Sequence, residues 1–327
     1  MDLRFVEMMR YARVPFELNV RPGDRVLIVT DTRVDPLVWQ ALAAACREVG
    51  GDPTLMIMTP RDLSGHEPPP EVAEAMKAST LNCLAASRSL AHTKARTEAA
   101  RAGAAQMWMD GLTPEILMEG ATAEQYREMQ ALAERLHRLW DEGETVRVTS
   151  PLGMDLTATI RDRLSFYITG TLVPHPLSGF MRCGFPDGEC GIAPVEGTCN
   201  GMAVFDSSMD GLGALEEPLR FTVEQSRVVH IAGGRQARQL QDLLRQHGDE
   251  NSLYFPAEIS IGLNPALRFV GKPRMDKKAR GGVHMAIGNN LMDGGVVDSR
   301  THLDAIARNC SLWIDGRLVV EHGEIRA

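Results

Sequence analysis

An alternation of apolar runs and helix-like segments fills the first 144 residues and most constrains the fold. The run RVLIVTD at 25–31 has a continuous apolar centre and is rich in β-branched residues, which is typical of a buried strand in a parallel sheet. Helix-like segments separate it from three further runs, at 53–59, 81–87 and 104–110. This rhythm predicts a parallel sheet with helices on both faces, closed by a long amphipathic helix at 122–143.

The pattern changes after residue 144. The segment at 145–161 alternates apolar and polar residues around a Pro-Leu-Gly turn, as hairpins do, and glycine-rich turns are common from there on. One helix, at 234–248, interrupts the strands. The sequence therefore predicts an α/β, Rossmann-like domain over 1–144 and a strand-rich α+β domain over 145–327. A chain of 327 residues is long enough for two such cores.

Composition and missing motifs exclude several classes of function. The formal net charge is −8 and no block of lysine or arginine occurs, which argues against nucleic acid or an anionic membrane as partner. Neither a signal-peptide pattern nor a bilayer-spanning apolar run is present, so we expect a cytoplasmic protein. Most of the six scattered cysteines are expected to be reduced and buried, and Cys183 and Cys190 are the two least expected to be inert. No GxGxxG motif follows the first strand, so no dinucleotide is expected.

Ionisable residues interrupt apolar segments of the second domain at four places. Glu189 lies in GFPDGECGIAPVEG, Glu258 in FPAEISIGLNP and His284 in GVHMAIGNN. His302 and Asp304 in THLD are two residues apart and can face the same way from a strand. A buried charge is costly unless it is paired or bound to metal. Together these five residues form a donor set for one or two divalent metals, which would supply a metal-activated water.

Each of these residues also has an interpretation without metal. Glu189 follows Pro-Asp-Gly and could be a turn residue, whereas Glu258 could pair with an arginine such as Arg268. His284 could be a hydrogen-bonded core histidine. The spacing does not decide between these interpretations, because the segments are far apart in sequence. The most basic stretch, RFVGKPRMDKKARGG at 268–282, is interpreted as a solvated loop.

Several motifs resemble those of the aminopeptidase T-like metallopeptidases. They are IAPVEGT, SIGLNP, HMAIGNN and THLDAIARNCSLWIDGRLV in the second domain, with NVRPGDRVLIVTDT and SLAHTKARTEAARAGA in the first. The resemblance implies two divalent metals in the C-terminal domain, and the matching ligand positions are Glu189, Glu258, His284, His302 and Asp304. The peptidases also carry a tyrosine shortly after the matching histidine, expected to stabilise the transition state, and HMAIGNNLMDGG has none.

A second branch of this superfamily, the 2,5-dihydroxypyridine 5,6-dioxygenases, is also similar, most closely around HLDAIARNCSLWIDGRLVV. The resemblance implies one Fe(II), bound by two histidines and one carboxylate, with positions left for substrate and O₂. His302 and Asp304 would be two of these ligands. Glu258 stands where that branch has a histidine, and that branch has no counterpart of Glu189 or His284.

Three functions follow as hypotheses. The leading one is a metal-dependent hydrolase of an amide or peptide-like bond, with Zn, Co or Mn bound and with Glu258 or Glu189 as general base. The alternative is an Fe(II)-dependent ring-cleaving dioxygenase for a dihydroxypyridine or similar hydroxylated aromatic. The third is a non-catalytic ligand-binding protein.

The expected partner is a small-molecule or short-peptide substrate, and the resemblance implies a homodimer. Asn289 and Asn290 are predicted to donate hydrogen bonds to the substrate. His92, between a strand and a helix of the first domain, is a further substrate-binding candidate.

Overall fold

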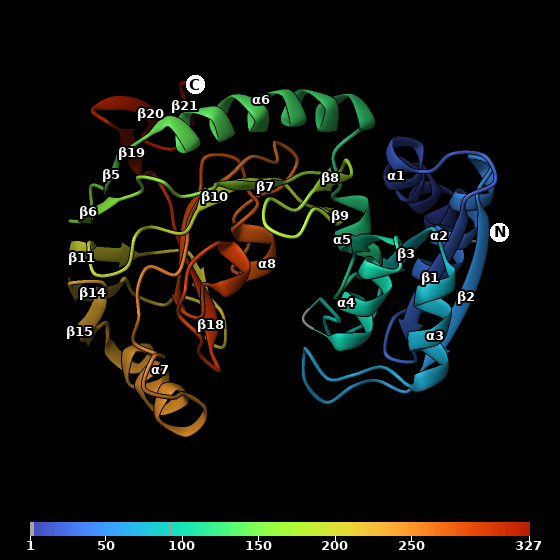
Figure 1. The fold of residues 1–327 in the computed structure, drawn as a ribbon, viewed down its shortest axis with the longest axis horizontal. Coiled ribbons are helices and arrows are strands. Elements are labelled where there is room, and N and C mark those ends of the chain that lie inside the picture. Colours follow the sequence, from blue (N-terminus) through green and yellow to red (C-terminus); the bar gives the residue numbers. More distant parts are fainter. Residues whose placement is uncertain (1–2, 92) are drawn as a thin grey trace. The chain divides into compact units, whose positions relative to one another are not determined.

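The computed structural model describes residues 3–91 and 93–327 (Figure 1). The chain forms two compact units, and each unit is built from two separate stretches of sequence. The first holds the residues up to Gln130 together with Ile168–Asp187, and the second holds Ala131–Tyr167 together with Gly188–Ala327. These bounds differ from the single boundary expected at 144, because a later segment returns to pair with the first sheet.

The first unit is an α/β sandwich with the predicted parallel sheet. The sheet has the order β2-β1-β3-β4-β9-β8, and only β8 runs antiparallel to its neighbour. The strands are β1 (Arg25–Asp31), β2 (Asp52–Met58), β3 (Leu81–Leu84), β4 (Ala105–Trp108), β8 (Val173–Pro174) and β9 (Met181–Gly184). The first four overlap the runs identified in the sequence, and β3 and β4 are shorter than predicted. Strand β9 is the returning segment, and it pairs with β4.

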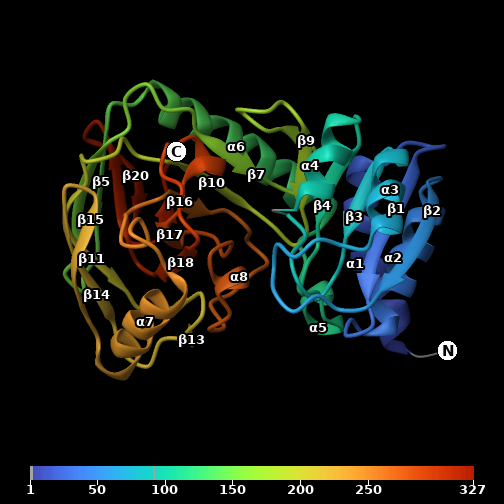
Figure 2. The same cartoon turned by 60° about the horizontal axis from the view of Figure 1, so that its bottom comes forward.

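Helices cover both faces of this sheet, as predicted. Figure 2 shows α1, α2 and α5 on one face and α3 and α4 on the other, in agreement with the contacts between these helices. Their bounds are α1 (Leu3–Asn19), α2 (Pro36–Glu48), α3 (Pro70–Ala78), α4 (Lys94–Arg101) and α5 (Pro114–Met118). Side-chain oxygens of Asp35, Thr93 and Thr113 cap the starts of α2, α4 and α5, which explains where these helices begin.

The second unit is strand-rich and contains two sheets whose described strand pairs are antiparallel. An eight-stranded sheet has the order β15-β14-β11-β6-β5-β19-β20-β21. Its strands are β5 (Thr145–Thr149), β6 (Asp155–Thr159), β11 (Asn200–Phe205), β14 (Leu219–Glu224), β15 (Arg227–Ala232), β19 (Ser311–Ile314), β20 (Arg317–Glu321) and β21 (Glu324–Ile325). The predicted hairpin at 145–161 is confirmed as β5 and β6.

The other sheet has seven strands in the order β13-β12-β18-β17-β16-β10-β7. They are β7 (Phe166–Ile168), β10 (Glu189–Ile192), β12 (Ser208–Met209), β13 (Gly213–Ala214), β16 (Ile259–Gly262), β17 (Val283–Gly288) and β18 (His302–Ala307). Every residue of β10, β16 and β17 is buried, so this sheet forms the core of the unit. All of the predicted metal ligands lie on it or directly beside it.

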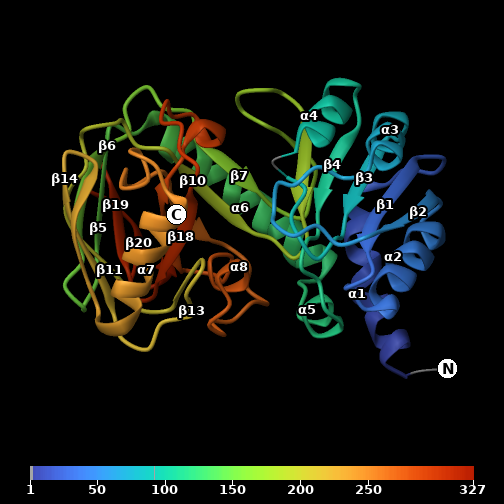
Figure 3. The same ribbon diagram turned by 90° about the horizontal axis from the view of Figure 1, so that it is seen from below.

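Four helical segments complete this part of the chain: α6 (Ala123–Glu142), α7 (Gly234–His247), α8 (Pro273–Asp276) and the 3-10 turn η1 (Leu291–Asp293). The predicted helices at 122–143 and 234–248 are confirmed as α6 and α7. The short helix α8 lies beside β12 and β18 (Figure 3). Among the described residues, no helix has both the length and the apolar character that crossing a bilayer requires. All six cysteines are free and buried, as expected.

Candidate metal centre

Strand register brings three of the predicted ligands to one face of the seven-stranded sheet. Residues directly opposite each other in antiparallel strands point to the same side. Asp304 on β18 lies opposite Ala286 on β17, and His302 lies opposite Gly288. His284 shares this face, because it is two residues before Ala286. The small Ala286 and Gly288 leave room over the strand for the ionisable side chains of its neighbours.

The same rule places both glutamates on this face. Ser260 on β16 lies opposite His284, and Glu258 is two residues before Ser260. Glu189 on β10 lies opposite Gly262, which is again two residues from Ser260. The five predicted ligands span more than a hundred positions of sequence, and the pairing of β10, β16, β17 and β18 brings them to one face of the sheet.

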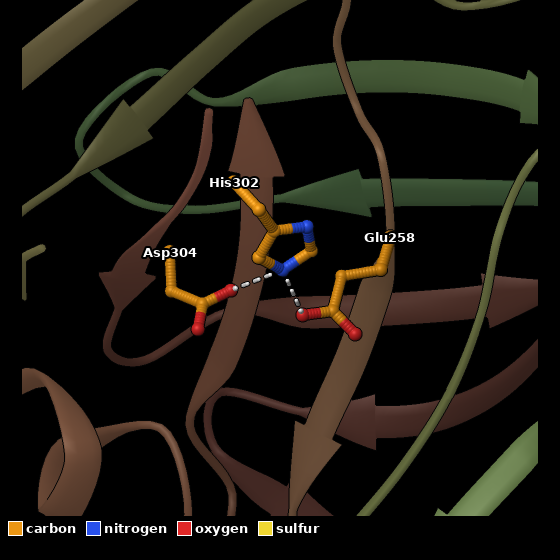
Figure 4. Close-up of side chains that lie close together, drawn as sticks. All are labelled: Glu258, His302 and Asp304. Atoms are coloured by element: carbon orange, nitrogen blue, oxygen red, sulfur yellow. Dashed lines mark ion pairs between the residues drawn. The ribbon is translucent and has the colours of Figure 1, made fainter. Parts of the chain in front are cut away.

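Glu258, His302 and Asp304 form the tightest group (Figure 4). Nε2 of His302 lies 3.5 Å from Oε1 of Glu258 and 3.5 Å from Oδ1 of Asp304. One ligand atom from each residue lies within 4.8 Å of the others. Metal–ligand bonds of about 2.0–2.2 Å make such separations compatible with a single shared ion.

His284 and Glu189 extend this group into the core. Nε2 of His284 lies 3.3 Å from Oε2 of Glu189 and 3.6 Å from Oε1 of Glu258. Oε1 of Glu258 is therefore close to both histidines, and it joins all five predicted ligands into one cluster. Both glutamates are only 4% exposed and His284 is fully buried.

Unsatisfied polar atoms in the cluster fit a bound cation. Among the described residues, buried atoms without a hydrogen-bond partner include Oδ1 of Asp304, Oε2 of Glu189 and both ring nitrogens of His284. Such atoms are rare in folded proteins and call for an explanation. Carboxylate oxygens and imidazole nitrogens form the donor set that divalent transition metals prefer. The Nδ1 of His302 lies 2.7 Å from the carbonyl oxygen of Asn289, a contact that orients the ring with Nε2 toward the carboxylates.

Two lysines complete the cluster, and the sequence analysis missed both. Lys278, which is only 3% exposed, forms an ion pair with Glu189. Nζ of Lys277 lies 2.5 Å from Oδ2 of Asp304. The interpretation of 268–282 as a solvated loop is therefore wrong at its centre. Three carboxylates in apolar segments require positive charge nearby. This requirement could have drawn attention to the adjacent Lys-Lys pair in the sequence.

The proposed pairing of Glu258 with Arg268 is also wrong. The Arg268 guanidinium donates instead to the carbonyl oxygens of Pro265 and Leu267. Glu258 accepts a hydrogen bond of 3.1 Å from Ser260 and faces the two histidines.

Comparison with known proteins shows the family to which this chain belongs. The family model described as NicX, 2,5-dihydroxypyridine 5,6-dioxygenase, matches residues 7–327. The chain belongs to the NicX family. It is therefore an enzyme, and the non-catalytic alternative is set aside. No match was found among curated proteins.

Two solved structures share the fold of this NicX-family chain over nearly its whole length. A 2,5-dihydroxypyridine dioxygenase from Pseudomonas putida KT2440 has 18% sequence identity and a TM-score of 0.80, covering 99% of this chain and 98% of its own. The wild-type AmpT from Thermus thermophilus has 14% identity and a TM-score of 0.65, covering 98% and 99%. The resemblance to the dioxygenase branch is thus confirmed by the family model, and AmpT shares the fold.

Electrostatics keep the carboxylates of this NicX-family enzyme ionised. Burial would raise the pKa of Asp304, but Lys277 and His302 outweigh it and hold that pKa well below its ordinary value. Burial likewise opposes ionisation of Glu189, and Lys278 and His284 hold its pKa below the ordinary value. Burial lowers the pKa of His284, yet the two glutamates raise it to about 9. The metal-free cluster therefore holds a charged imidazole that must lose its proton before it can bind metal.

This arrangement predicts that the metal-free enzyme loses stability as the pH rises from about 6.5 to about 9. The ionic contribution of His284 is complete below its unfolded pKa of 6.5 and disappears above its folded pKa of about 9. The loss should reach about 3 kcal/mol. Urea unfolding in the presence of a chelator measures it. His284→Asn should make the profile less steep but not flat, because, against the effect of burial, Asp304 and Glu258 raise the pKa of His302 as well. A wild-type profile that is already flat would contradict the charged imidazole.

The predicted substrate-binding residues have other roles in the structure. Nδ2 of Asn289 donates to Asp298 and to the carbonyl oxygen of Ser299. Asn290 is fully buried, and its side chain bonds to Glu196, Tyr254 and the backbone of Val297. The structure thus commits both asparagine side chains to holding the loop after β17. His92 lies outside the described residues.

Proposed function

We propose that this chain is an Fe(II)-dependent dioxygenase that opens the ring of a dihydroxypyridine or a similar small hydroxylated aromatic. The observation that carries the proposal is the group Glu258, His302 and Asp304 in a chain that matches the NicX family from residue 7 to residue 327. Three protein ligands leave coordination positions for a substrate oxygen and O₂. From the sequence alone, amide hydrolysis is the leading hypothesis and ring opening the alternative; the family match favours ring opening.

Each of the three residues has a defined part in this chemistry. Asp304 and Glu258 provide anionic oxygens that stay ionised because Lys277 and the histidines oppose the effect of burial. His302 provides a nitrogen whose ring is oriented by the Asn289 carbonyl. Fe(II) held by these three residues would supply the redox chemistry that O₂ requires. The two carboxylates are buried, and the His302 side is open to substrate and solvent.

The donor set has one histidine and two carboxylates, whereas the usual facial triad has two histidines and one carboxylate. The other histidine, His284, is fully buried, and its Nε2 lies 3.6 Å from Oε1 of Glu258. Carboxylate-rich sites suit harder ions such as Mn²⁺, so the identity of the metal is the first quantity to measure.

The test is metal analysis followed by O₂ uptake. Protein purified anaerobically without chelators should contain about one iron per chain and should consume O₂ with 2,5-dihydroxypyridine. Zinc-loaded protein is the matched control and should be inactive, because zinc has no redox chemistry. About two zinc ions per chain, with no O₂ uptake after iron loading, would overturn the proposal.

One observation favours hydrolysis of an amide bond as a second candidate. Oε1 of Glu258 lies near both His302 and His284, and Glu189 adds a further carboxylate. A shared carboxylate between two histidine-containing groups is the arrangement that a two-metal hydrolase uses. A metal content of two per chain and release of an amine from a small amide would establish this alternative.

A further inference from the structure

The open side of the metal cluster is formed by His302 and Lys277. The side chains of the other four predicted ligands are at most 6% exposed. The side chain of His302 is 35% exposed, and that of Lys277 is 22% exposed. Solvent, and therefore substrate, reaches the cluster beside these two residues.

The ammonium group of Lys277 has unused hydrogen-bonding capacity. Its one hydrogen bond within the described part of the chain goes to Oδ2 of Asp304, at 2.5 Å. The other oxygen of that carboxylate, Oδ1, faces His302 at 3.5 Å. An ammonium group carries three N–H donors, so two remain for a molecule that binds next to the metal.

A buried carboxylate holds Lys277 in place. Asp276, the residue before it, is fully buried and accepts hydrogen bonds from the hydroxyls of Ser207 and Ser208 at 2.8 and 2.7 Å. It also accepts hydrogen bonds from the backbone N–H groups of Val270 and Gly271 at 2.8 and 3.1 Å. Four hydrogen bonds fix the backbone at the end of α8, and the ion pair with Asp304 holds the ammonium group itself, so Lys277 differs from a freely moving surface lysine.

We propose that Lys277 binds an anionic oxygen of the substrate, a ring hydroxylate that also contacts the metal, and thereby selects ionised hydroxyaromatic substrates. A fixed positive charge beside the open coordination positions stabilises the ionised form of such a hydroxyl over its neutral form. This inference rests on the proposed function, because it takes a hydroxylated ring as the substrate.

The experiment is an anaerobic absorbance titration of the Fe(II)-loaded protein with 4-nitrocatechol, whose colour reports whether its hydroxyls are ionised. Wild type should bind the ionised form. Lys277→Met should bind at least tenfold more weakly and shift the bound spectrum toward the neutral form, whereas Lys277→Arg should recover most of the affinity. Lys272→Met, a change at an exposed lysine of the same segment, is the matched control and should behave as wild type.

Imidazole separates this role from damage to the metal site, because it is a neutral ligand of the metal. At saturating Fe(II), metal content and imidazole affinity should be equal in wild type and Lys277→Met, because the bound cation then keeps Asp304 ionised in both proteins. Equal 4-nitrocatechol binding in the two proteins would overturn the inference. So would a parallel loss of metal or imidazole binding in the variant, which would mean that Lys277 only supports Asp304. Wild type that binds iron and imidazole, but neither 4-nitrocatechol nor 2,5-dihydroxypyridine, would overturn the proposed function itself.

Discussion

Replacing Asp304 or His302 by alanine should abolish metal binding and activity together. Asp304 provides Oδ1, a buried oxygen without a hydrogen-bond partner among the described residues, and His302 provides the nitrogen between the two carboxylates. Loss of a residue that merely supports a ligand already costs roughly 10–100-fold in metal affinity, so loss of a ligand should exceed about 100-fold. Isothermal titration with Fe(II) or Zn(II) measures the affinity, and O₂ uptake measures the activity.

The matched control is Asp242→Ala, which removes an exposed carboxylate on α7 that pairs with the surface Arg245. It should leave metal binding and activity unchanged. Thermal unfolding of all three variants shows whether they are folded. Full metal content in a folded Asp304→Ala protein would rule out Asp304 as a ligand.

Replacing Lys278 by methionine should destabilise the metal-free protein by about 3–5 kcal/mol. Lys278 and Glu189 are 3% and 4% exposed and form an ion pair in the core of the second unit. The variant removes the lysine partner of the buried Glu189 carboxylate and leaves only His284, 3.3 Å away, to offset the desolvation penalty in a low-dielectric setting. Urea unfolding with a chelator present measures the change.

The double variant Lys278→Met, Glu189→Gln is the control for this effect. It removes both charges, so it should recover a large part of the lost stability. The single variant should also regain stability as the pH falls and Glu189 takes up a proton. An unfolding free energy within 1 kcal/mol of wild type for the single variant would show that the pair carries little of the stability.

Much of the fold was predictable because the pattern of the first 144 residues is local. The strand at 25–31 is apolar on both faces, and only a parallel sheet covered by helices buries both faces of such a strand. Strand β9 escaped prediction because its four residues carry no clear period and its partner β4 is more than seventy positions earlier. For the same reason, the single boundary expected at 144 did not assign residues 168–187, which contain β9, to the first unit.

The candidate site was predictable as a list of residues but not as an arrangement. His302 and Asp304 are two apart on one strand, so their common face followed from the spacing alone. Glu189, Glu258 and His284 were candidates because each interrupts an apolar segment, and the resemblance matched them to ligand positions. The register of β10, β16, β17 and β18 is what places all five on one side of one sheet.

The sequence by itself determined the two kinds of unit and the residue types available to bind a metal, because apolar periodicity and side-chain chemistry are local properties. Only the tertiary structure decided which charges balance which. Lys277 and Lys278 reach Asp304 and Glu189 because α8 is anchored beside the sheet by the buried Asp276. Electrostatic energies depend on distance and burial in space, and neither quantity is written in the order of residues along the chain.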